Sequence, residues 1–301
     1  MEDTQESPSQ AGRIMIVTGA NTGLGYETAL SLAQKGAKVI LACRNLSKAN
    51  AAKTRIEKEV PAADLEVMEI DLSNLNSVHK FADAYQSKYD RLDVLINNAG
   101  VMMPPYTKTE DGFELQFEAN YLGHFLLTGL LLDTLLKTPD SRVVTLSSIA
   151  HKNGKINFDD LQSEKAYDAS AAYGQSKLAC LMFAYELQRR LEKAGHQQTI
   201  STAAHPGIAT TELARHMPKL VYAVLKYTLA PFLTHPPDEG AQPTILAAIG
   251  EAKGGDYFGP TGFQEMKGKA GKASSTDLSR DKAIAQRLWK KSEELVGYQY
   301  L

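Results

Sequence analysis

Arg13-Ile-Met-Ile-Val-Thr-Gly-Ala-Asn-Thr-Gly-Leu-Gly25 is the stretch that decides the fold. Residues 13–18 form a mostly apolar run, which is typical of a strand buried on both faces of a parallel sheet. The glycines Gly19, Gly23 and Gly25 follow, and a helical pattern then continues as far as Gly36. A glycine-rich turn between a strand and a helix brings backbone N–H groups and the positive end of the helix dipole to a pyrophosphate. The stretch therefore predicts a nucleotide-binding turn, with a plain strand-to-helix turn as the alternative.

Strand and helix patterns alternate from this turn to about residue 205. Strands are expected at 13–18, 37–43, 65–70, 92–97, 142–147 and 199–204, and helices at 23–35, 47–59, 75–88, 112–136 and 171–194. Beyond them we expect a helix at 238–249, a short strand within 254–260, a surface loop at 267–272 and a closing helix at 277–296. The alternation predicts an α/β fold, a Rossmann-like doubly wound parallel sheet of about seven strands flanked by helices.

The composition is that of one globular domain. The 301 residues are 43% hydrophobic and 23% charged, and no linker-like stretch interrupts the interior, so residues 13–301 are expected to form a single domain. Residues 1–12 are polar, lack the order of a signal peptide and are expected to form a disordered tail. The net charge of −2 is not concentrated in runs, which argues against nucleic-acid binding and favours a small-molecule partner.

Cysteine and histidine usage bears on compartment and metals. Two cysteines, Cys43 and Cys180, are too few for a disulfide framework or a cysteine zinc site, and a cytoplasmic location is expected. The seven histidines show no metal-binding spacing, so no metal is expected. The longest apolar stretch, 220–234, is interrupted by Lys226 and Pro231 and is shorter than the ~20 residues that span a bilayer, so no transmembrane segment is expected.

Arg44 follows the second strand and bears on cofactor choice. An acid at this position would bind the adenosine ribose and repel a 2′-phosphate, whereas arginine can pair with that phosphate. NADP(H) is therefore favoured over NAD(H), with a solvated cation as the alternative for Arg44. Asp71 follows the third strand, where an adenine ring would rest; its alternative role is to cap the helix near Leu75.

Polar side chains also follow the fourth and fifth strands. Asn98-Ala-Gly100 and Ser147-Ser148 lie at strand ends, where such residues either form turns or hold a ligand. Asn120 lies in an otherwise apolar helix, so its amide either bonds within the core or holds a functional group. Its neighbours Tyr121 and His124 are interpreted as packing residues.

Tyr173 and Lys177 are four residues apart and therefore share one face of a helix. A nearby ammonium favours the ionised form of a phenol, which would suit the tyrosine to general acid or base catalysis near neutral pH. A hydroxyl such as that of Ser148 could polarise a substrate carbonyl. A pair on a solvated helix face is the alternative.

Taken in order, these motifs resemble a known superfamily. They are Thr18-Gly-x-x-x-Gly-x-Gly25, Asp71, Asn98-Ala-Gly100, Asn120, Ser148, Tyr173-x-x-x-Lys177 and Pro206-Gly207. With them the chain resembles the short-chain dehydrogenase/reductase superfamily over almost its whole length. Asn120-Tyr-Leu-Gly-His-Phe-Leu-Leu-Thr128 and Ser147-Ser-Ile-Ala-His151 are similar to the retinol dehydrogenase and WW-domain oxidoreductase branch. Tyr121 replaces a frequent histidine of that branch, and the sequence shows no membrane anchor or WW module, so a membrane retinoid role is not expected.

The resemblance implies a role for each catalytic candidate. Tyr173 would give a proton to the carbonyl oxygen in reduction, or remove the hydroxyl proton in oxidation. Lys177 would lower the pKa of that tyrosine and hold the nicotinamide ribose. Ser148, with Ser147 as the alternative, would bind the carbonyl oxygen, and Asn120 would order a water leading to the lysine.

The resemblance also implies a set of cofactor contacts. Pro206, Ile208 and Thr211 would position the nicotinamide carboxamide so that hydride leaves one face of the ring. The full set of expected cofactor-binding residues is Gly19, Asn21, Thr22, Gly23, Leu24, Gly25, Arg44, Asp71, Leu72, Asn98, Ala99, Gly100, Tyr173, Lys177, Pro206, Gly207, Ile208 and Thr211.

The expected function is NADP(H)-dependent interconversion of a carbonyl and an alcohol. The stretch 220–234 falls in the region 208–240, where the superfamily usually covers its substrate, and it favours an apolar substrate; a core or dimer helix is the alternative. Alternative functions are an NADP(H)-binding sensor or scaffold without turnover, and a reductase of a conjugated C=C bond. The resemblance further suggests a homodimer or homotetramer through the helices at 112–136 and 171–194.

Overall fold

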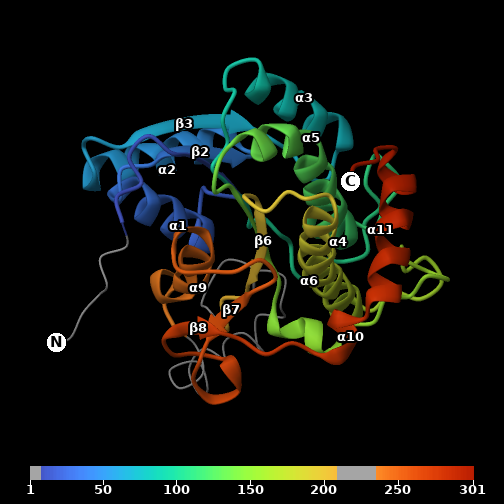
Figure 1. Ribbon diagram of the computed structural model, residues 1–301. Helices are drawn as coiled ribbons and strands as arrows, with labels where there is room; N and C mark the ends of the chain where they lie inside the picture. The colour runs from blue at the N-terminus through green and yellow to red at the C-terminus, as the bar shows by residue number, and fades with distance from the viewer. Residues whose placement is uncertain (1–7, 209–234) are drawn as a thin grey trace.

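An eight-stranded sheet forms the centre of the molecule, with the strand order β3-β2-β1-β4-β5-β6-β7-β8 (Figure 1). The computed structural model describes residues 8–208 and 235–301, so Thr211, residues 1–7 of the expected tail and the apolar stretch 220–234 lie outside the described residues. The strands are β1 (Ile14–Thr18), β2 (Lys38–Cys43), β3 (Asp64–Glu69), β4 (Val94–Asn97), β5 (Arg142–Leu146), β6 (Ile200–Ala204), β7 (Tyr257–Pro260) and β8 (Ala270–Lys272).

Helices connect these strands as the alternation predicted. The α-helices are α1 (Gly23–Gln34), α2 (Leu46–Glu59), α3 (Leu75–Gln86), α4 (Leu115–Phe117), α5 (Gly123–Lys137), α6 (Ala169–Lys193), α9 (Pro237–Ile249), α10 (Asp277–Arg280) and α11 (Lys282–Val296). The shorter turns are a π-helix η1 (Glu118–Leu122) and the 3-10 helices η2 (Ile149–Asn153) and η5 (Phe263–Glu265).

The strand order makes the fold doubly wound. Strand β1 pairs in parallel with both β2 and β4, so the chain moves outward from β1 first in one direction and then in the other. At such a switch point the helices leave opposite faces of the sheet, and a crevice opens at the carboxyl ends of the strands. The predicted fold class is confirmed, and this crevice is where a nucleotide should bind.

The predicted surface loop at 267–272 is wrong for its second half. Residues Ala270–Lys272 form β8, which pairs antiparallel with β7 and raises the strand count to eight. Three residues that include Gly271 carry no detectable strand period, so the strand is revealed only by its pairing with β7.

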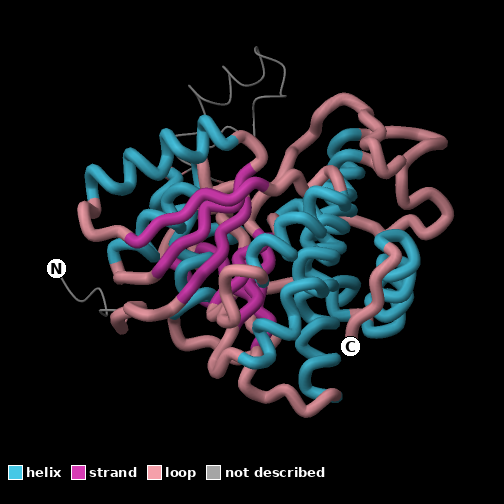
Figure 2. Tube along the Cα trace, turned by 90° about the horizontal axis from the view of Figure 1, so that it is seen from above, coloured by secondary structure: helices cyan, strands magenta, loops and turns pink. Residues whose placement is uncertain are grey.

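Alternate residues of each central strand face opposite helical layers. In β1, Ile16 belongs to one apolar core, and Met15 and Val17 belong to the other. Helices α3, α5, α6 and α11 pack on the first side, and α1, α2 and α9 on the second, so the sheet lies between two layers of helices (Figure 2). None of the helices in residues 8–208 and 235–301 has the length and apolar character needed to span a bilayer.

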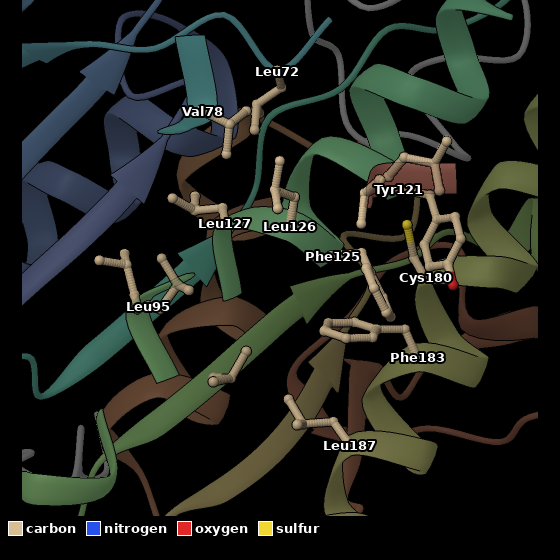
Figure 3. Packing of buried hydrophobic residues seen from close by; sticks show 14 of the residues in the cluster. Leu72, Val78, Leu95, Tyr121, Phe125, Leu126, Leu127, Cys180, Phe183 and Leu187 are labelled. Atoms are coloured by element: carbon tan, nitrogen blue, oxygen red, sulfur yellow. The ribbon is translucent and has the colours of Figure 1, made fainter. Parts of the chain in front are cut away.

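Aromatic side chains join α5, α6 and α11. Phe125 faces Phe183, with ring centroids 5.6 Å apart (Figure 3). The Trp289 ring of α11 stacks on Phe183 at 5.7 Å, and the Tyr300 hydroxyl donates a hydrogen bond to the Phe125 carbonyl. Every residue of α6 from 172 to 188 is buried within the single chain. Residues 172–188 of α6 are thus covered within one chain, in part by α11, and a homodimer or homotetramer through the two long helices stays a prediction.

The helix predicted at 112–136 is divided by a π-turn. It begins at Leu115, passes through the wider π-helix Glu118–Leu122 and continues as α5. A single π-turn inside an α-helix is rare, and such turns are frequently found at functional sites. Asn120 lies in the middle of this turn.

His124 ties α5 to the first strand. Its Nδ1 donates a hydrogen bond to the Asn120 carbonyl at 3.0 Å, so the bare Nε2 accepts from the Thr18 hydroxyl at 2.9 Å. The ring is 2% exposed, and this burial lowers its pKa to about 4. His124 is a core residue, as predicted, and so is Tyr121, whose hydroxyl is hydrogen-bonded to Ser292.

This buried neutral imidazole predicts acid sensitivity. Unfolded histidine titrates near pH 6.5, so between pH 6.5 and 4 the unfolded state binds a proton that the folded state excludes, and stability falls as the pH falls. At pH 5 His124 should account for about 2 kcal/mol of lost unfolding free energy. His124→Asn, which keeps the N–H toward Asn120, should therefore show a smaller loss than the wild type in urea unfolding at pH 7.5 and 5.0.

The exposed His79 of α3 supplies the control, since His79→Asn should retain the wild-type pH dependence. A residual slope is expected in His124→Asn because burial also lowers the pKa of His151 and His205. Equal pH dependence in the wild type and His124→Asn would contradict the assignment.

Candidate active site

Most of the predicted site segments follow the carboxyl ends of adjacent strands, whereas Asn120, Tyr173 and Lys177 lie on helices. The last residues of neighbouring strands lie in register, as the pairs Thr18 with Ala42 and Leu146 with Ala204 show. The strands β2, β1, β4, β5 and β6 therefore deliver their following residues to one edge of the sheet. Parallel topology alone thus brings together motifs that are distant in the sequence.

A cleft of about 590 Å³ lies along the first half of this edge. Twelve of the predicted cofactor residues line it: Gly19, Asn21, Thr22, Gly23, Leu24, Gly25, Arg44, Asp71, Leu72, Asn98, Ala99 and Gly100. Residues that the sequence reasoning did not select also line it, among them Lys48, Val101, Met102, Pro104 and Pro105. The cleft has the size and lining expected of a nucleotide site.

The glycine-rich turn at the base of the cleft requires glycine. Gly19 has φ of +69°, which L side chains rarely adopt. A Cβ at Gly25 would lie 2.4 Å from the Gly19 carbonyl oxygen and 2.5 Å from Nδ2 of Asn98. These positions let the turn pack closely on the strand ends and leave the backbone open to the cleft.

The N-terminus of α1 is suited to an anion. Its N-cap residue, Thr22, makes no side-chain cap, whereas α2, α3 and α6 are capped by Asn45, Asn74 and Asp168. The first N–H groups of a helix have no partner within the helix, and here the residues that carry them line the cleft. A pyrophosphate placed there would accept these hydrogen bonds and meet the positive end of the helix dipole.

Thr18, which the sequence reasoning treated only as part of a motif, holds the turn in place. Its hydroxyl oxygen accepts hydrogen bonds from the N–H groups of Asn98 and Ala99, both at 2.9 Å. In return, Nδ2 of Asn98 donates to the Thr18 carbonyl at 2.6 Å. The ends of β1 and β4 are thereby fixed to each other beneath the cleft.

Two cations and one acid line the end of the cleft that lies after β2 and β3. We call it the adenosine end, because the adenosine of a bound nucleotide would lie there. The Arg44 side chain is 62% exposed, with Nη1 3.8 Å from an Asp71 oxygen, and Lys48 also lines the cleft. Asp71 accepts two hydrogen bonds from Ser73, while Asn74 caps α3. The alternative role of Asp71 as the helix cap is therefore wrong.

Tyr173 and Lys177 lie together on α6, as the spacing predicted. The Lys177 Nζ is 6.0 Å from the centre of the Tyr173 ring and donates a hydrogen bond to the Leu146 carbonyl at 3.1 Å. Both side chains are buried, at 6% and 7% exposure. The pair is therefore shielded from water, with the ammonium held in place by a backbone carbonyl.

Asn120 links this pair to the end of β4. Its Oδ1 accepts from the Val101 N–H at 2.7 Å, and its Nδ2 donates to the Ser176 hydroxyl at 3.0 Å. The Ser176 hydroxyl in turn donates to the Tyr173 carbonyl. The Asn120 amide is thus satisfied within the core, as one alternative proposed, while it lies beside the tyrosine-lysine turn.

The two serines differ in what their hydroxyls do. Ser147 is 3% exposed and donates to the Lys177 carbonyl at 2.8 Å, so its proton is committed. Ser148 is half-buried, and its oxygen accepts from the Ala150 N–H at 3.2 Å, which leaves its proton available. His151 Nδ1 holds the loop by donating to the Ser148 carbonyl at 2.6 Å. This arrangement favours Ser148 over Ser147 as the donor to a substrate oxygen.

The remaining predicted residues lie beyond the cleft. Asn120, Ser148, Tyr173 and Lys177 are not part of its lining and follow it along the sheet edge, as do residues 206–208 after β6. The 206–208 loop is anchored by a hydrogen bond from the Ile208 N–H to the Met266 carbonyl at 2.8 Å. The structure therefore places the cleft and a tyrosine-lysine-serine group side by side.

Close packing at Gly154 generates a test of this arrangement. Gly154 ends the turn that Ser148 begins, and a Cβ there would lie 2.3 Å from the carbonyl oxygen of Gly174, which follows Tyr173. Its φ of −71° suits alanine, so the effect of Gly154→Ala would be steric. We expect a loss of about 1–3 kcal/mol in urea unfolding. The exposed neighbour Asn153→Ala is the control, and equal stability of the two variants would contradict the close approach.

Comparison with known proteins identifies the family of this chain. A family model described as short chain dehydrogenase matches residues 13–219. Retinol dehydrogenase 13 from Mus musculus is 44% identical over 300 residues, which cover 96% of this chain and 86% of that protein.

Solved structures of other proteins share this fold. An uncharacterised protein from Mycobacterium paratuberculosis is 40% identical, with a TM-score of 0.81 and coverage of 98% of this chain and 97% of that chain. RhlG from Pseudomonas aeruginosa, solved as an active-site complex with NADP, is 26% identical, with a TM-score of 0.65 and coverage of 83% and 94%. The chain therefore belongs to the short-chain dehydrogenase/reductase superfamily and is an oxidoreductase of its retinol dehydrogenase-like branch.

Proposed function

We propose that the protein uses NADP(H) to interconvert an apolar carbonyl compound and its alcohol. The observation that carries this proposal is the buried pair Tyr173 and Lys177, with the available hydroxyl of Ser148 on the adjoining loop, at the end of a nucleotide-sized cleft. A protein that only binds a nucleotide has no chemical need for a buried phenol beside a cation.

The cleft fits NADP(H) on the donor groups it offers. The uncapped start of α1 would hold the pyrophosphate, and Arg44 and Lys48 would face the 2′-phosphate. RhlG, a relative by structure, was solved with NADP. The nicotinamide would supply or accept the hydride.

The side chains of this chain would do the proton work. In the reductive direction Ser148 would donate a hydrogen bond to the carbonyl oxygen, and Tyr173 would transfer its proton to that oxygen. Lys177 would stabilise the resulting phenolate, since its ammonium is held near the ring by the Leu146 carbonyl. Asn120 would keep α5 and α6 in register around this group through Val101 and Ser176.

The substrate class is inferred from apolar lining and from the relatives. Val101, Met102, Pro104 and Pro105 line the cleft after Gly100, on the side of the tyrosine-lysine pair. The curated relatives are named for retinol, an apolar primary alcohol. We therefore propose apolar aldehydes, ketones and alcohols as substrates. With both cysteines free and buried, we further propose a reducing, cytoplasmic location.

Arg44→Asp tests the cofactor. The substitution removes a cation from the 2′-phosphate and adds repulsion, so we expect the Kd for NADPH to rise about 10- to 100-fold while that for NADH hardly changes. Titration of nicotinamide fluorescence measures both constants. Lys58→Asp, near the far end of α2, is the control for net charge. Equal weakening of both cofactors would count against the proposed role of Arg44.

Tyr173→Phe tests the chemistry. Loss of the proton donor should lower kcat about 100- to 10,000-fold, with the Kd for NADPH within about threefold of the wild type. NADPH oxidation with apolar aldehydes and ketones, including retinal, measures turnover. Tyr185→Phe on the same helix is the control. Unchanged turnover would exclude Tyr173 as the acid, and product analysis would separate reduction of C=O from reduction of C=C.

A further inference from the structure

A turn near the C-terminal end meets two loops of the active-site edge. The 3-10 helix Phe263–Glu265 and the next residue, Met266, follow β7. The Met266 carbonyl accepts the hydrogen bond from the Ile208 N–H that anchors the loop after β6. The same turn reaches the loop after β5 through a single carboxylate, that of Glu265.

The Glu265 carboxylate contacts side chains from three segments of the chain. Its Oε1 accepts hydrogen bonds from the backbone N–H and the hydroxyl of Ser274, both at 2.7 Å. Its Oε2 accepts from Lys152 Nζ at 3.0 Å and lies 3.6 Å from His205 Nε2. Lys152 belongs to the turn that Ser148 begins, and His205 directly precedes Pro206. One carboxylate, 17% exposed, thus links the carbonyl-binding loop to the loop expected to hold the nicotinamide.

The hydrogen-bond partners of His205 decide which ring nitrogen carries the proton. Nδ1 accepts from the Gly207 N–H at 3.2 Å, so the proton of the neutral ring lies on Nε2 and points toward Glu265. Burial lowers the pKa of His205, which keeps the ring neutral at pH 7. The Tyr257 ring lies between His205 and His151, with centroids 5.2 and 5.7 Å away, and adds a second contact between the two loops.

The backbone at this turn is strained. Gln264 and Glu265 have φ of +49° and +59°, values that residues other than glycine, asparagine and aspartate rarely adopt. Such conformations persist only where surrounding contacts impose them, and they are concentrated at functional sites. Here the Glu265 carboxylate and the Met266 carbonyl contact neighbouring segments, and backbone hydrogen bonds close the turn itself.

We propose that Glu265 is a positioning residue for catalysis, which sets the spacing between the Ser148 loop and the 206–208 loop. This inference rests on the function proposed above. Small displacements of reacting groups cost about 100-fold in rate, so a side chain that fixes two loops can control turnover without touching substrate. The adenosine end of the cleft, formed by the α1 turn and Arg44, lies on other strands and should not respond to Glu265.

Three probes separate the two ends of the site: NADPH, the fragment 2′,5′-ADP and turnover of an apolar aldehyde. In Glu265→Gln, which keeps the size but removes the charge, we expect kcat to fall about 10- to 100-fold. NADPH should bind about three- to tenfold more weakly, with 2′,5′-ADP unchanged. Glu265→Asn, which suits the positive φ, should behave in the same way and guards against misfolding of the first variant.

The Lys152 partner and a remote ion pair complete the design. Lys152→Met should also lower kcat. Combining it with Glu265→Gln should lower kcat little further, because both substitutions remove the same ion pair between Lys152 and Glu265. Lys272→Met, which breaks the exposed pair with Asp256 at 3.0 Å, should leave all three measurements unchanged.

Two results would overturn the proposal. One is wild-type kcat in both Glu265 variants. The other is a parallel loss of NADPH and 2′,5′-ADP binding together with a lower melting temperature, which would show a general structural role. If the wild type binds neither NADPH nor 2′,5′-ADP, the proposed function itself fails, and that outcome is distinct because it appears before any substitution.

Discussion

The site depends on the hydrogen bonds of Thr18 at the switch point of the sheet. Its hydroxyl receives the N–H groups that follow β4 and contacts His124, which is bonded to the Asn120 carbonyl. The Asn120 side chain donates a hydrogen bond to the Ser176 hydroxyl, which donates in turn to the Tyr173 carbonyl. One buried chain of hydrogen bonds therefore runs from the glycine-rich turn to the expected proton donor. Because Thr18, His124, Asn120 and Ser176 are buried, breaking a hydrogen bond between them would leave a polar partner unsatisfied, and this cost holds the cleft and Tyr173 in a fixed relation.

The two ends of the site are built by different means. At the end formed by the α1 turn and Arg44, backbone N–H groups and exposed cations offer general complementarity to phosphates, and Gly19 and Gly25 let the turn pack closely on the strand ends. At the other end, side chains that are distant in the sequence lie together, and the Glu265 carboxylate contacts Lys152 of the Ser148 loop and His205 before the 206–208 loop. The first end is built from segments that directly follow the strands, whereas the second also needs helix α6 and the C-terminal turn.

This difference explains what the sequence could and could not predict. The residues that follow the strands were predictable, because alternation implies a parallel sheet and a parallel sheet gathers strand ends. The strand Ala270–Lys272 and the π-turn around Asn120 were not, because both are defined by pairing or packing rather than by a repeat. The burial of α6 under α11 and the contact of His205 with Glu265 likewise depend on partners that no local pattern connects.

The central claim is that the cleft and the Tyr173 group act together to deliver hydride to a carbonyl carbon. The most direct measurement is to supply NADPH deuterated at one or the other face of nicotinamide C4 with an apolar aldehyde, and to locate the label in the product by mass spectrometry. We expect deuterium on the carbinol carbon of the product with NADPH labelled on one face, and none with NADPH labelled on the other. Deuterium on a former C=C carbon, or no transfer from either face, would contradict it.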